Sequence, residues 1–324
     1  MFESYIPEKF CREFVDIKGY SSQLALIMAT IKGVKPCMDD WVSMNMYDQY
    51  VKACKKYGLF IVPDAIFKMV PKSQVASKII GGNRLITTIA FGQPFDKNNK
   101  NKDCLVHVFL SRSKSDLDRC MKDGWYPLII NNRLIDKPLI DNFKFGYGLG
   151  YPKCCVDFFH KYNNWFKYSY LYEALKNTKS FNFLCNPFLK NSTYSYIYHM
   201  PCSYGCSKTI KLAKAVRDAI KEEDPRFVEA VDQHLRLPIL VFYETKIYAF
   251  EGKIKNGRLY YKKVYYTGID PENNIYEGDL QKGDCAFVEN NDVVILKNGK
   301  LVQRIEAKKK KFAPESPFIL QLKK

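Results

Sequence analysis

The feature that most constrains the fold is a change of pattern at Pro238, after which apolar and polar residues alternate with a period of two. The alternating segments are separated by Asn-Gly, Thr-Gly, Glu-Gly and Lys-Gly pairs, which are typical of turns between strands. Asn298-Gly299, between VVIL and LVQRI, is the strongest hairpin signal in the chain. We therefore expect an antiparallel β-barrel or sandwich of about five to seven strands after Pro238.

The preceding residues lack this alternation and combine helical with strand-like segments. Ser22–Ile31 predicts a buried helix, and Tyr47–Tyr57 predicts a second helix closed by Gly58. A hairpin turn is expected at Gly81-Gly82-Asn83. The hydrophilic stretch Asp96–Asp103 has no apolar anchor, and we expect a domain boundary there.

The segments after this boundary predict a β-α-β unit. Strands at Cys104–Leu110 and Tyr126–Ile130 flank a helix at Ser113–Asp123. The expected fold class is α+β, with mixed α/β N-terminal and central regions and a small C-terminal antiparallel β-barrel or sandwich. The expected domains are residues 1–102, 103–236 and 237–306, followed by a basic tail at 307–324 that contains Lys308–Lys311.

The composition excludes several classes of protein. Of the 324 residues, 47% are hydrophobic and 26% charged, as in globular proteins and unlike collagen-like, coiled-coil or disordered chains. No apolar run approaches the ~18 residues of a spanning helix, and the first residues do not resemble a secretory signal. We therefore expect a soluble, cytoplasmic protein without a membrane partner.

The net charge favours polyanionic partners. Lys and Arg number 51 and Asp and Glu 34, which gives a formal charge of +17. Such a balance is typical of proteins that bind nucleic acid, phosphorylated substrates or acidic proteins. An AT-rich genome produces the same excess of lysine, isoleucine, tyrosine and asparagine without selection for binding, so both explanations stay open.

Two clusters of cysteines are the clearest chemical signal. The chain has 11 cysteines, an odd number without an export signal, which favours metal binding or thiol chemistry over disulfides. Cys154-Cys155 lies within GYPKCCVDFF, and Cys202 and Cys206 lie within HMPCSYGC. In each cluster a proline precedes the cysteines and a helix is expected to follow. The positive end of a helix dipole lowers the thiol pKa and favours the thiolate that binds metals or acts as a nucleophile.

The spacing within each cluster predicts how the sulfurs converge. Cys202 and Cys206 lie about one helical turn apart, so both can face one centre. Cys154 and Cys155 are consecutive, so we expect a non-helical backbone at one of them. With His199 as a fifth candidate, these residues form a predicted site for an iron–sulfur cluster or for zinc. Buried, unreactive thiols or a disulfide between the clusters are the alternatives.

The paired motifs GYP-x-CC-x-x-FF, at Gly150–Phe159, and H-x-PCS-x-x-C, at His199–Cys206, resemble an archaeal protein family of unknown function that carries the same two signatures. The resemblance covers about the middle third of the chain, from about Cys104 to His234. It implies that the four cysteines and His199 belong to one site. It implies no activity, so the chemistry rests on the residues themselves.

Several residues near the clusters are further candidates. Asp157 and His160 lie one turn apart on the helix after the first cluster and could move protons or support a metal ligand through a hydrogen bond. The glycines of Gly146–Gly150 do not match a dinucleotide-binding motif, and we expect them to allow close backbone approach to the neighbouring cysteines.

A basic stripe is expected on the helix that follows the second cluster. Its members recur every three or four residues and form a candidate phosphate- or nucleic-acid-binding surface: Lys208, Lys211, Lys214, Arg217 and Lys221. The alternative is a solvated helix face. Tyrosines interleaved with lysines in the C-terminal region could stack on bases, namely Tyr260, Tyr261, Tyr265 and Tyr266. Tyrosine is also an ordinary strand residue, which is the alternative for this group.

Three functional hypotheses follow. The leading one is an intracellular metalloprotein that binds an iron–sulfur cluster and acts in redox or sulfur-transfer chemistry on an anionic substrate, with RNA as a candidate. The second is a nucleic-acid-binding module in which a structural zinc ion holds the two loops. The third is a metal-free enzyme with a cysteine nucleophile. The sequence leaves the substrate, the reaction and the oligomeric state open.

Overall fold

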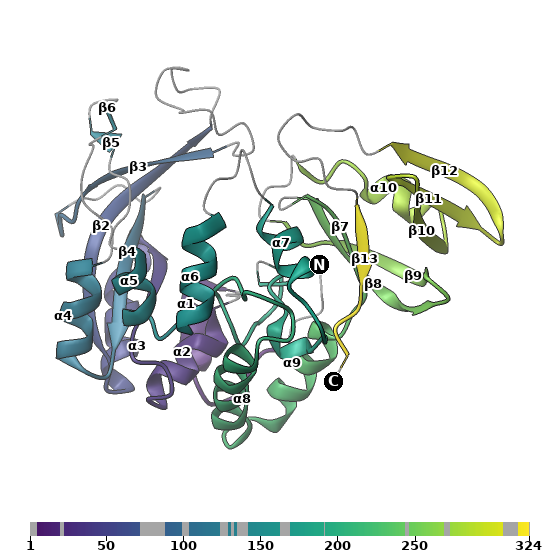
Figure 1. Cartoon of the computed structure of the whole chain (residues 1–324). Coiled ribbons are helices and arrows are strands. Elements are labelled where there is room, and N and C mark those ends of the chain that lie inside the picture. The colour runs from purple at the N-terminus through teal and green to yellow at the C-terminus, as the bar shows by residue number, and fades with distance from the viewer. Residues whose placement is uncertain are drawn as a thin grey trace. The chain divides into compact units, whose positions relative to one another are not determined.

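The three-dimensional structure is a computed structural model of the chain (Figure 1). It describes residues 5–19, 23–71, 88–98, 104–123, 129–130, 133–134, 142–162, 169–190, 192–243, 246–268, 273–306 and 317–323. The chain divides into two compact units, Ile6–Val156 and Met1–Tyr5 with Asp157–Lys324. The division falls within helix α6 (Lys153–Tyr162). Each unit is described by itself.

The first unit contains a four-stranded antiparallel sheet in the order β1-β4-β2-β3. Its strands are β1 (Met38–Ser43), β2 (Phe60–Pro71), β3 (Thr88–Pro94) and β4 (Cys104–Ser111). Its helices are α1 (Arg12–Lys18), α2 (Leu24–Ile31), α3 (Tyr47–Lys56), α4 (Lys114–Asp123) and α5 (Asn142–Gly148), with a 3-10 turn, η1 (Met44–Met46), before α3. Two further strands, β5 (Ile129–Ile130) and β6 (Arg133–Leu134), pair with each other.

Two helices of this unit match the sequence expectation. All eight residues of α2, LALIMATI, are buried, because a helix that is apolar on every side is stable only inside a core. Helix α3 is followed by Gly58 with a φ of +69°, a left-handed conformation that ends the helix without the penalty a Cβ would cause. The helices predicted at 22–31 and 47–57 are therefore confirmed.

The parallel β-α-β unit expected around α4 is wrong for the described residues. Strand β4 pairs antiparallel with β1 and β2, which occupy both of its sides, and β5 pairs antiparallel with β6 instead. Because β1 and β2 precede the hydrophilic stretch Asp96–Asp103, the boundary expected near residue 102 lies between strands of one sheet. The turn expected at Gly81-Gly82-Asn83 lies outside the described residues.

The second unit combines helices with a seven-stranded antiparallel sheet in the order β12-β11-β10-β9-β8-β7-β13. Its helices are α7 (Tyr170–Lys176), α8 (Ser207–Lys221), α9 (Pro225–Leu235) and α10 (Glu277–Gln281), with a 3-10 turn, η4 (Phe183–Cys185). The strands are β7 (Ile239–Tyr243), β8 (Lys246–Lys255), β9 (Arg258–Tyr266), β10 (Cys285–Glu289), β11 (Asp292–Lys297), β12 (Lys300–Glu306) and β13 (Phe318–Leu320).

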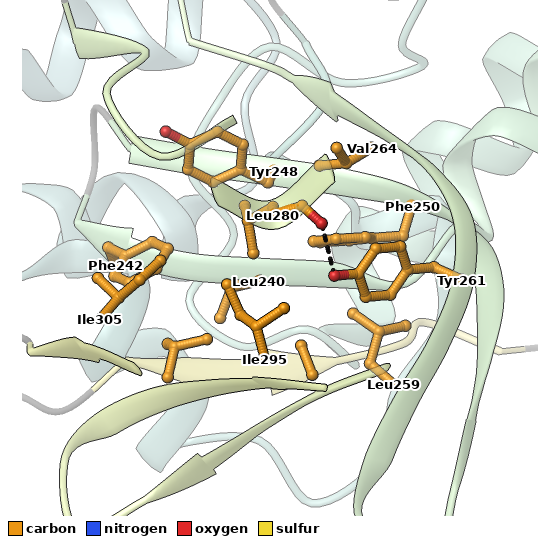
Figure 2. Packing of buried hydrophobic residues seen from close by; sticks show 12 residues of the cluster. Leu240, Phe242, Tyr248, Phe250, Leu259, Tyr261, Val264, Leu280, Ile295 and Ile305 are labelled. Carbon is orange, nitrogen blue, oxygen red and sulfur yellow. Dashed lines mark hydrogen bonds between the residues drawn. The ribbon is translucent and has the colours of Figure 1, made fainter. Parts of the chain in front are cut away.

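The sheet curls around its own core. Figure 2 shows the cluster of buried hydrophobic side chains that forms this core, with strands passing on both sides of it. Within the cluster the Tyr261 hydroxyl donates a hydrogen bond to the Leu280 carbonyl of α10 at 2.7 Å. The α+β class and the antiparallel C-terminal sheet are confirmed. Among the described strands the sheet is open, with β12 and β13 at its edges, and these strands do not close into a barrel. The buried members of the cluster are Leu240, Phe242, Tyr248, Phe250, Leu259, Tyr261, Val264, Leu280, Ala286, Val293, Ile295 and Ile305.

The hairpin predicted at Asn298-Gly299 is confirmed. These residues have φ values of +50° and +77° and connect β11 to β12, as a two-residue turn with two positive φ angles requires. Asn256-Gly257 connects β8 to β9 in the same way, with φ values of +51° and +72°. Both turns connect paired antiparallel strands without a longer loop.

The last strand comes from the region expected to be a basic tail. Phe318–Leu320 forms β13 and pairs with β7, because its residues FIL are apolar and β7 offers an open edge. The residues Lys308–Lys311 lie outside the described part of the chain. Among the described helices, none is long and apolar enough to cross a membrane.

Candidate metal centre

The first cysteine pair lies in the first turn of α6. The carbonyl of Pro152 accepts hydrogen bonds from the N–H groups of Cys155 at 2.9 Å and Val156 at 3.1 Å, which starts the helix. Cys154 and Cys155 are both helical, so the expectation of a non-helical backbone at one of them is wrong. Their sulfur atoms still lie only 3.9 Å apart, because staggered rotamers allow adjacent side chains on a helix to converge.

The glycines before α6 permit close packing of this turn. Gly150 has a φ of +78°, and a Cβ at this position would lie 2.7 Å from Cδ of Pro36. A Cβ at Gly148 would lie 2.9 Å from Sγ of Cys120. The glycines are therefore needed for packing against Pro36 and Cys120, and not against the clustered cysteines as the sequence indicated.

The second pair is held by a tight loop that leads into α8. Cys206 is the residue before the helix, and its N–H donates to the carbonyl of Ser203 at 3.2 Å. Only glycine fits at position 205, because a Cβ there would lie 2.1 Å from the carbonyl oxygen of Ser180. The loop therefore brings Cys202 and Cys206 to one side within five residues.

Tyr204 anchors this loop to the segment before it. Its side chain is fully buried and its hydroxyl donates to the carbonyl of Leu171 in α7 at 2.7 Å. Its N–H donates to Oγ1 of Thr178 at 2.8 Å, and its carbonyl accepts from the N–H of Asn182 at 2.8 Å. Three hydrogen bonds on one residue fix the loop in place between the two cysteines.

The four sulfur atoms lie together. The Sγ atoms of Cys154, Cys155, Cys202 and Cys206 are all within 4.8 Å of one another. Cys155 and Cys206 are buried, whereas Cys154 and Cys202 are half-buried. A group of four thiols in this space could hold a metal ion, because four thiolates form the complete ligand set of a structural zinc site.

Two helix N-termini lie at this group. Cys154 and Cys155 lie in the first turn of α6, and Cys206 directly precedes α8. Each helix contributes about half a positive charge at this end, which attracts anions. Burial, together with the neighbouring Cys206, raises the pKa of Cys185 to about 12. Its Sγ donates to the Cys206 carbonyl at 3.7 Å, so it acts as a thiol donor beside the group.

His199, Asp157 and His160 are not members of the four-sulfur group. His199 is buried, and its Nε2 lies 3.0 Å from Oγ1 of Thr209, a fully buried residue in the first turn of α8. This hydrogen bond holds the start of the helix that follows Cys206. Asp157 is half-buried and His160 exposed, both on α6 beyond the cysteines.

The five members of the basic stripe on α8 differ in their exposure to solvent. Lys208, Lys211, Lys214 and Lys221 are exposed, whereas Arg217 is half-buried and points to α9. The guanidinium of Arg217 donates to both carboxylate oxygens of Asp232, with Nη2 2.8 Å from Oδ2 and Nε 3.1 Å from Oδ1. Arg217 is therefore engaged in joining two helices.

Sequence reasoning missed the residues that support this arrangement. Tyr204 and Gly205 fix the loop between the second pair of cysteines, and Asp232 receives Arg217. An aromatic residue followed by glycine inside a Cys-x-x-x-Cys loop is a local signal for the first two. Asp232 lies 15 positions from Arg217 on another helix, and no local pattern marks the pair.

Comparison of the chain with models of protein families, with curated proteins and with solved structures finds no match. The functional assignment therefore rests on the geometry of the four-sulfur group and its surroundings.

Proposed function

We propose that Cys154, Cys155, Cys202 and Cys206 bind a single zinc ion that cross-links the first turn of α6 to the start of α8. The observation that carries this proposal is the mutual distance of the four sulfur atoms, at most 4.8 Å. Four thiolates placed tetrahedrally at a zinc–sulfur distance of about 2.3 Å lie about 3.8 Å from one another. The 3.9 Å between the sulfurs of Cys154 and Cys155 agrees with that value.

The same distances argue against the iron–sulfur cluster favoured by the motif. In a four-iron cluster each thiolate binds its own iron atom, so the four sulfurs lie further apart than around one ion. Binding a single ion would require less rearrangement of the four cysteine side chains than binding a four-iron cluster. The spacing therefore supports the zinc alternative over the iron–sulfur hypothesis.

The ligand set supports a structural role for the ion. Catalytic zinc sites keep one coordination position for water or substrate, whereas four protein ligands close the site. The four cysteines, which two helix starts and a hydrogen-bonded loop hold near one another, would fill all four positions. Binding free energy at such a site is folding free energy, so removal of the ion should destabilise the surrounding elements.

The test is metal analysis of protein purified without oxygen. We expect one zinc per chain in the wild type and in the control Cys285→Ser, whose thiol is buried in β10 outside the group. Cys202→Ser and Cys155→Ser should lose most of the metal. Cobalt substitution should give the intense visible absorption of tetrahedral Co(II) bound to thiolates.

Three results would contradict the proposal. A brown protein with iron and acid-labile sulfide would establish the iron–sulfur alternative. Equal metal content in Cys202→Ser, Cys155→Ser and Cys285→Ser would remove the assignment to this group. A metal-free wild type with rapidly alkylated thiols would favour the cysteine-nucleophile hypothesis.

A further inference from the structure

The outer face of the C-terminal sheet carries an unusual set of side chains around one exposed aromatic ring. Strand β9 alternates strictly at this point: Leu259 and Tyr261 are buried in the core, whereas Arg258, Tyr260 and Lys262 are exposed. Tyr260 is 40% exposed. Because side chains alternate between faces along a strand, these three exposed residues lie in a row on the face opposite the core.

The neighbouring strand adds positive charge to this row. In the register of β8 with β9, Lys253 lies opposite Tyr260 and Lys255 lies opposite Arg258. Directly opposite residues on antiparallel strands have Cβ atoms about 5 Å apart. Tyr260 is therefore surrounded by Lys253, Arg258 and Lys262, with Lys255 adjoining.

These cations are available to a ligand. Among the described residues, no carboxylate forms an ion pair with Lys253, Lys255 or Lys262. The two acidic residues nearby are engaged elsewhere: Glu251 accepts from the Tyr265 hydroxyl and lies 3.7 Å from Nζ of Lys263, and Asp284 accepts from the Asn298 N–H at 3.0 Å. The local charge of the row is therefore positive.

A second aromatic surface adjoins the row. The guanidinium of Arg258 lies over the ring of Phe287 in β10, 4.7 Å from its centroid. This contact holds the planar guanidinium by cation–π attraction. An Arg plane held in this way can stack on a base beside the tyrosine ring.

The strand geometry hollows this face into a cleft of about 630 Å³. Its charged and aromatic lining includes Lys253, Arg258, Tyr260 and Lys262 together with the two engaged carboxylates, Glu251 and Asp284. The register of β8 with β9 shifts between Glu251 and Gly252, and only glycine fits at 252, because a Cβ would lie 2.1 Å from the Tyr260 carbonyl oxygen. A bulge of this kind bends the strand and increases its twist.

We propose that this face, formed by Lys253, Lys255, Arg258, Tyr260 and Lys262, binds single-stranded nucleic acid. An exposed aromatic ring within a basic groove is the arrangement that binds single strands with little sequence preference, since bases stack on the ring and phosphates meet the cations. An acidic peptide would satisfy the cations but would leave the ring without a stacking partner. The inference rests on the sheet and is independent of the zinc proposal.

The test uses the full chain and a fluorescein-labelled polyuridylate of about twelve nucleotides, within the range of site sizes of single-strand binders. Binding is followed by fluorescence anisotropy over a series of salt concentrations. We expect Tyr260→Ala to weaken binding between about 5-fold and about 150-fold, the range for loss of one stacked base, with an unchanged salt slope. Tyr260→Phe should keep most of the affinity.

A charge-matched pair of variants separates this surface from net charge. The double variant Lys253→Gln/Lys262→Gln should reduce the salt slope by about 1.4, at about 0.7 per lost phosphate contact. The control Lys208→Gln/Lys211→Gln removes the same charge from α8 and should leave slope and affinity near those of the wild type. Thermal unfolding of all variants verifies that they remain folded, which is expected because the substituted side chains are exposed.

Four outcomes would overturn the inference. Equal loss of affinity in both double variants would assign binding to net charge, and loss only in the α8 variant would assign it to that helix. No binding of polyuridylate by the wild type, or equal binding of a poly-glutamate peptide that competes with it, would exclude a single-strand site. Metal content does not enter these measurements, so failure of the zinc proposal remains distinguishable.

Discussion

The interpretation of Arg217 as a residue that joins two helices can be tested by replacing it. Arg217→Gln removes a guanidinium whose hydrogen bonds reach Asp232 at 2.8, 3.0 and 3.1 Å. The carboxylate of Asp232 is 9% exposed and the Arg217 side chain 25% exposed. Hydrogen bonds to charged groups contribute about 1.5–3 kcal/mol each when shielded from water.

Two features lower the expected cost below the sum of these bonds. Partial exposure of Arg217 allows water to screen the interaction. Asp232 also accepts a hydrogen bond from the Tyr196 hydroxyl at 2.9 Å and lies 3.6 Å from Nη1 of Arg236. The carboxylate therefore retains two partners when the Arg217 guanidinium is removed. We therefore expect a loss of about 2 kcal/mol, well below the ~3–5 kcal/mol for breaking an isolated buried pair.

The assay is thermal unfolding followed by circular dichroism, with urea unfolding as a second measure. For a unit of this size, a loss of about 2 kcal/mol corresponds to a decrease in Tm of about 4–8 °C. The matched control is Lys214→Gln, an exposed position on the same helix that should change stability by no more than about 0.5 kcal/mol. Equal Tm values for the two variants would refute the structural role of Arg217.

Two further predictions concern other parts of the chain. His107 is buried between Asp39 and Asp64; burial lowers its pKa, but hydrogen bonds to both carboxylates outweigh this and raise it above the usual value. The free energy of unfolding that protonated His107 contributes is therefore complete below the unfolded-state pKa of about 6.5 and is lost as pH rises through the higher pKa of the folded state. In urea unfolding, the difference in free energy of unfolding between the wild type and His107→Gln should therefore decrease as pH rises. An advantage that is constant or grows with pH would contradict this assignment. Gly205→Ala should displace the Cys202–Cys206 loop and reduce the amount of bound zinc. The control is Gly257→Ala, where nothing lies within 4 Å of the added Cβ, so this variant should strain only its own turn and leave the metal content unchanged. Equal metal content in the two variants would show that the loop tolerates the shift.

Features set by neighbouring residues could be predicted from the sequence. The turn at Asn298-Gly299 depends on two adjacent residues that tolerate positive φ, and the alternation of β9 depends on a period of two. The burial of α2 follows from a run that is apolar on every side. The turn, the alternation and the burial of the helix are each determined by residues that lie within or directly beside the element itself.

Features that depend on distant residues could not be predicted in this way. Strand β4 lies between β1 and β2, far earlier in the chain, and this choice of partners is not visible in its own residues. Arg217 belongs to a regular basic stripe, and only the position of Asp232 on α9 separates it from the lysines. The four cysteines were grouped correctly because unusual local motifs marked them, whereas His199, within the same motif, forms its hydrogen bond with Thr209.

The pairing of β13 with β7 has a consequence for the order in which the protein can fold during synthesis. Strands β7 to β12 form a meander in which each strand pairs with the next, so they can assemble as they leave the ribosome. Val241 in β7, however, pairs with Phe318, which is made 77 residues later. Until then β7 presents an open row of backbone donors and acceptors, the kind of edge that recruits strands from other chains. The nascent protein therefore passes through a stage in which strands β7 to β12 are made while β7 is still open to association, and pairing with the three-residue strand β13 covers that edge.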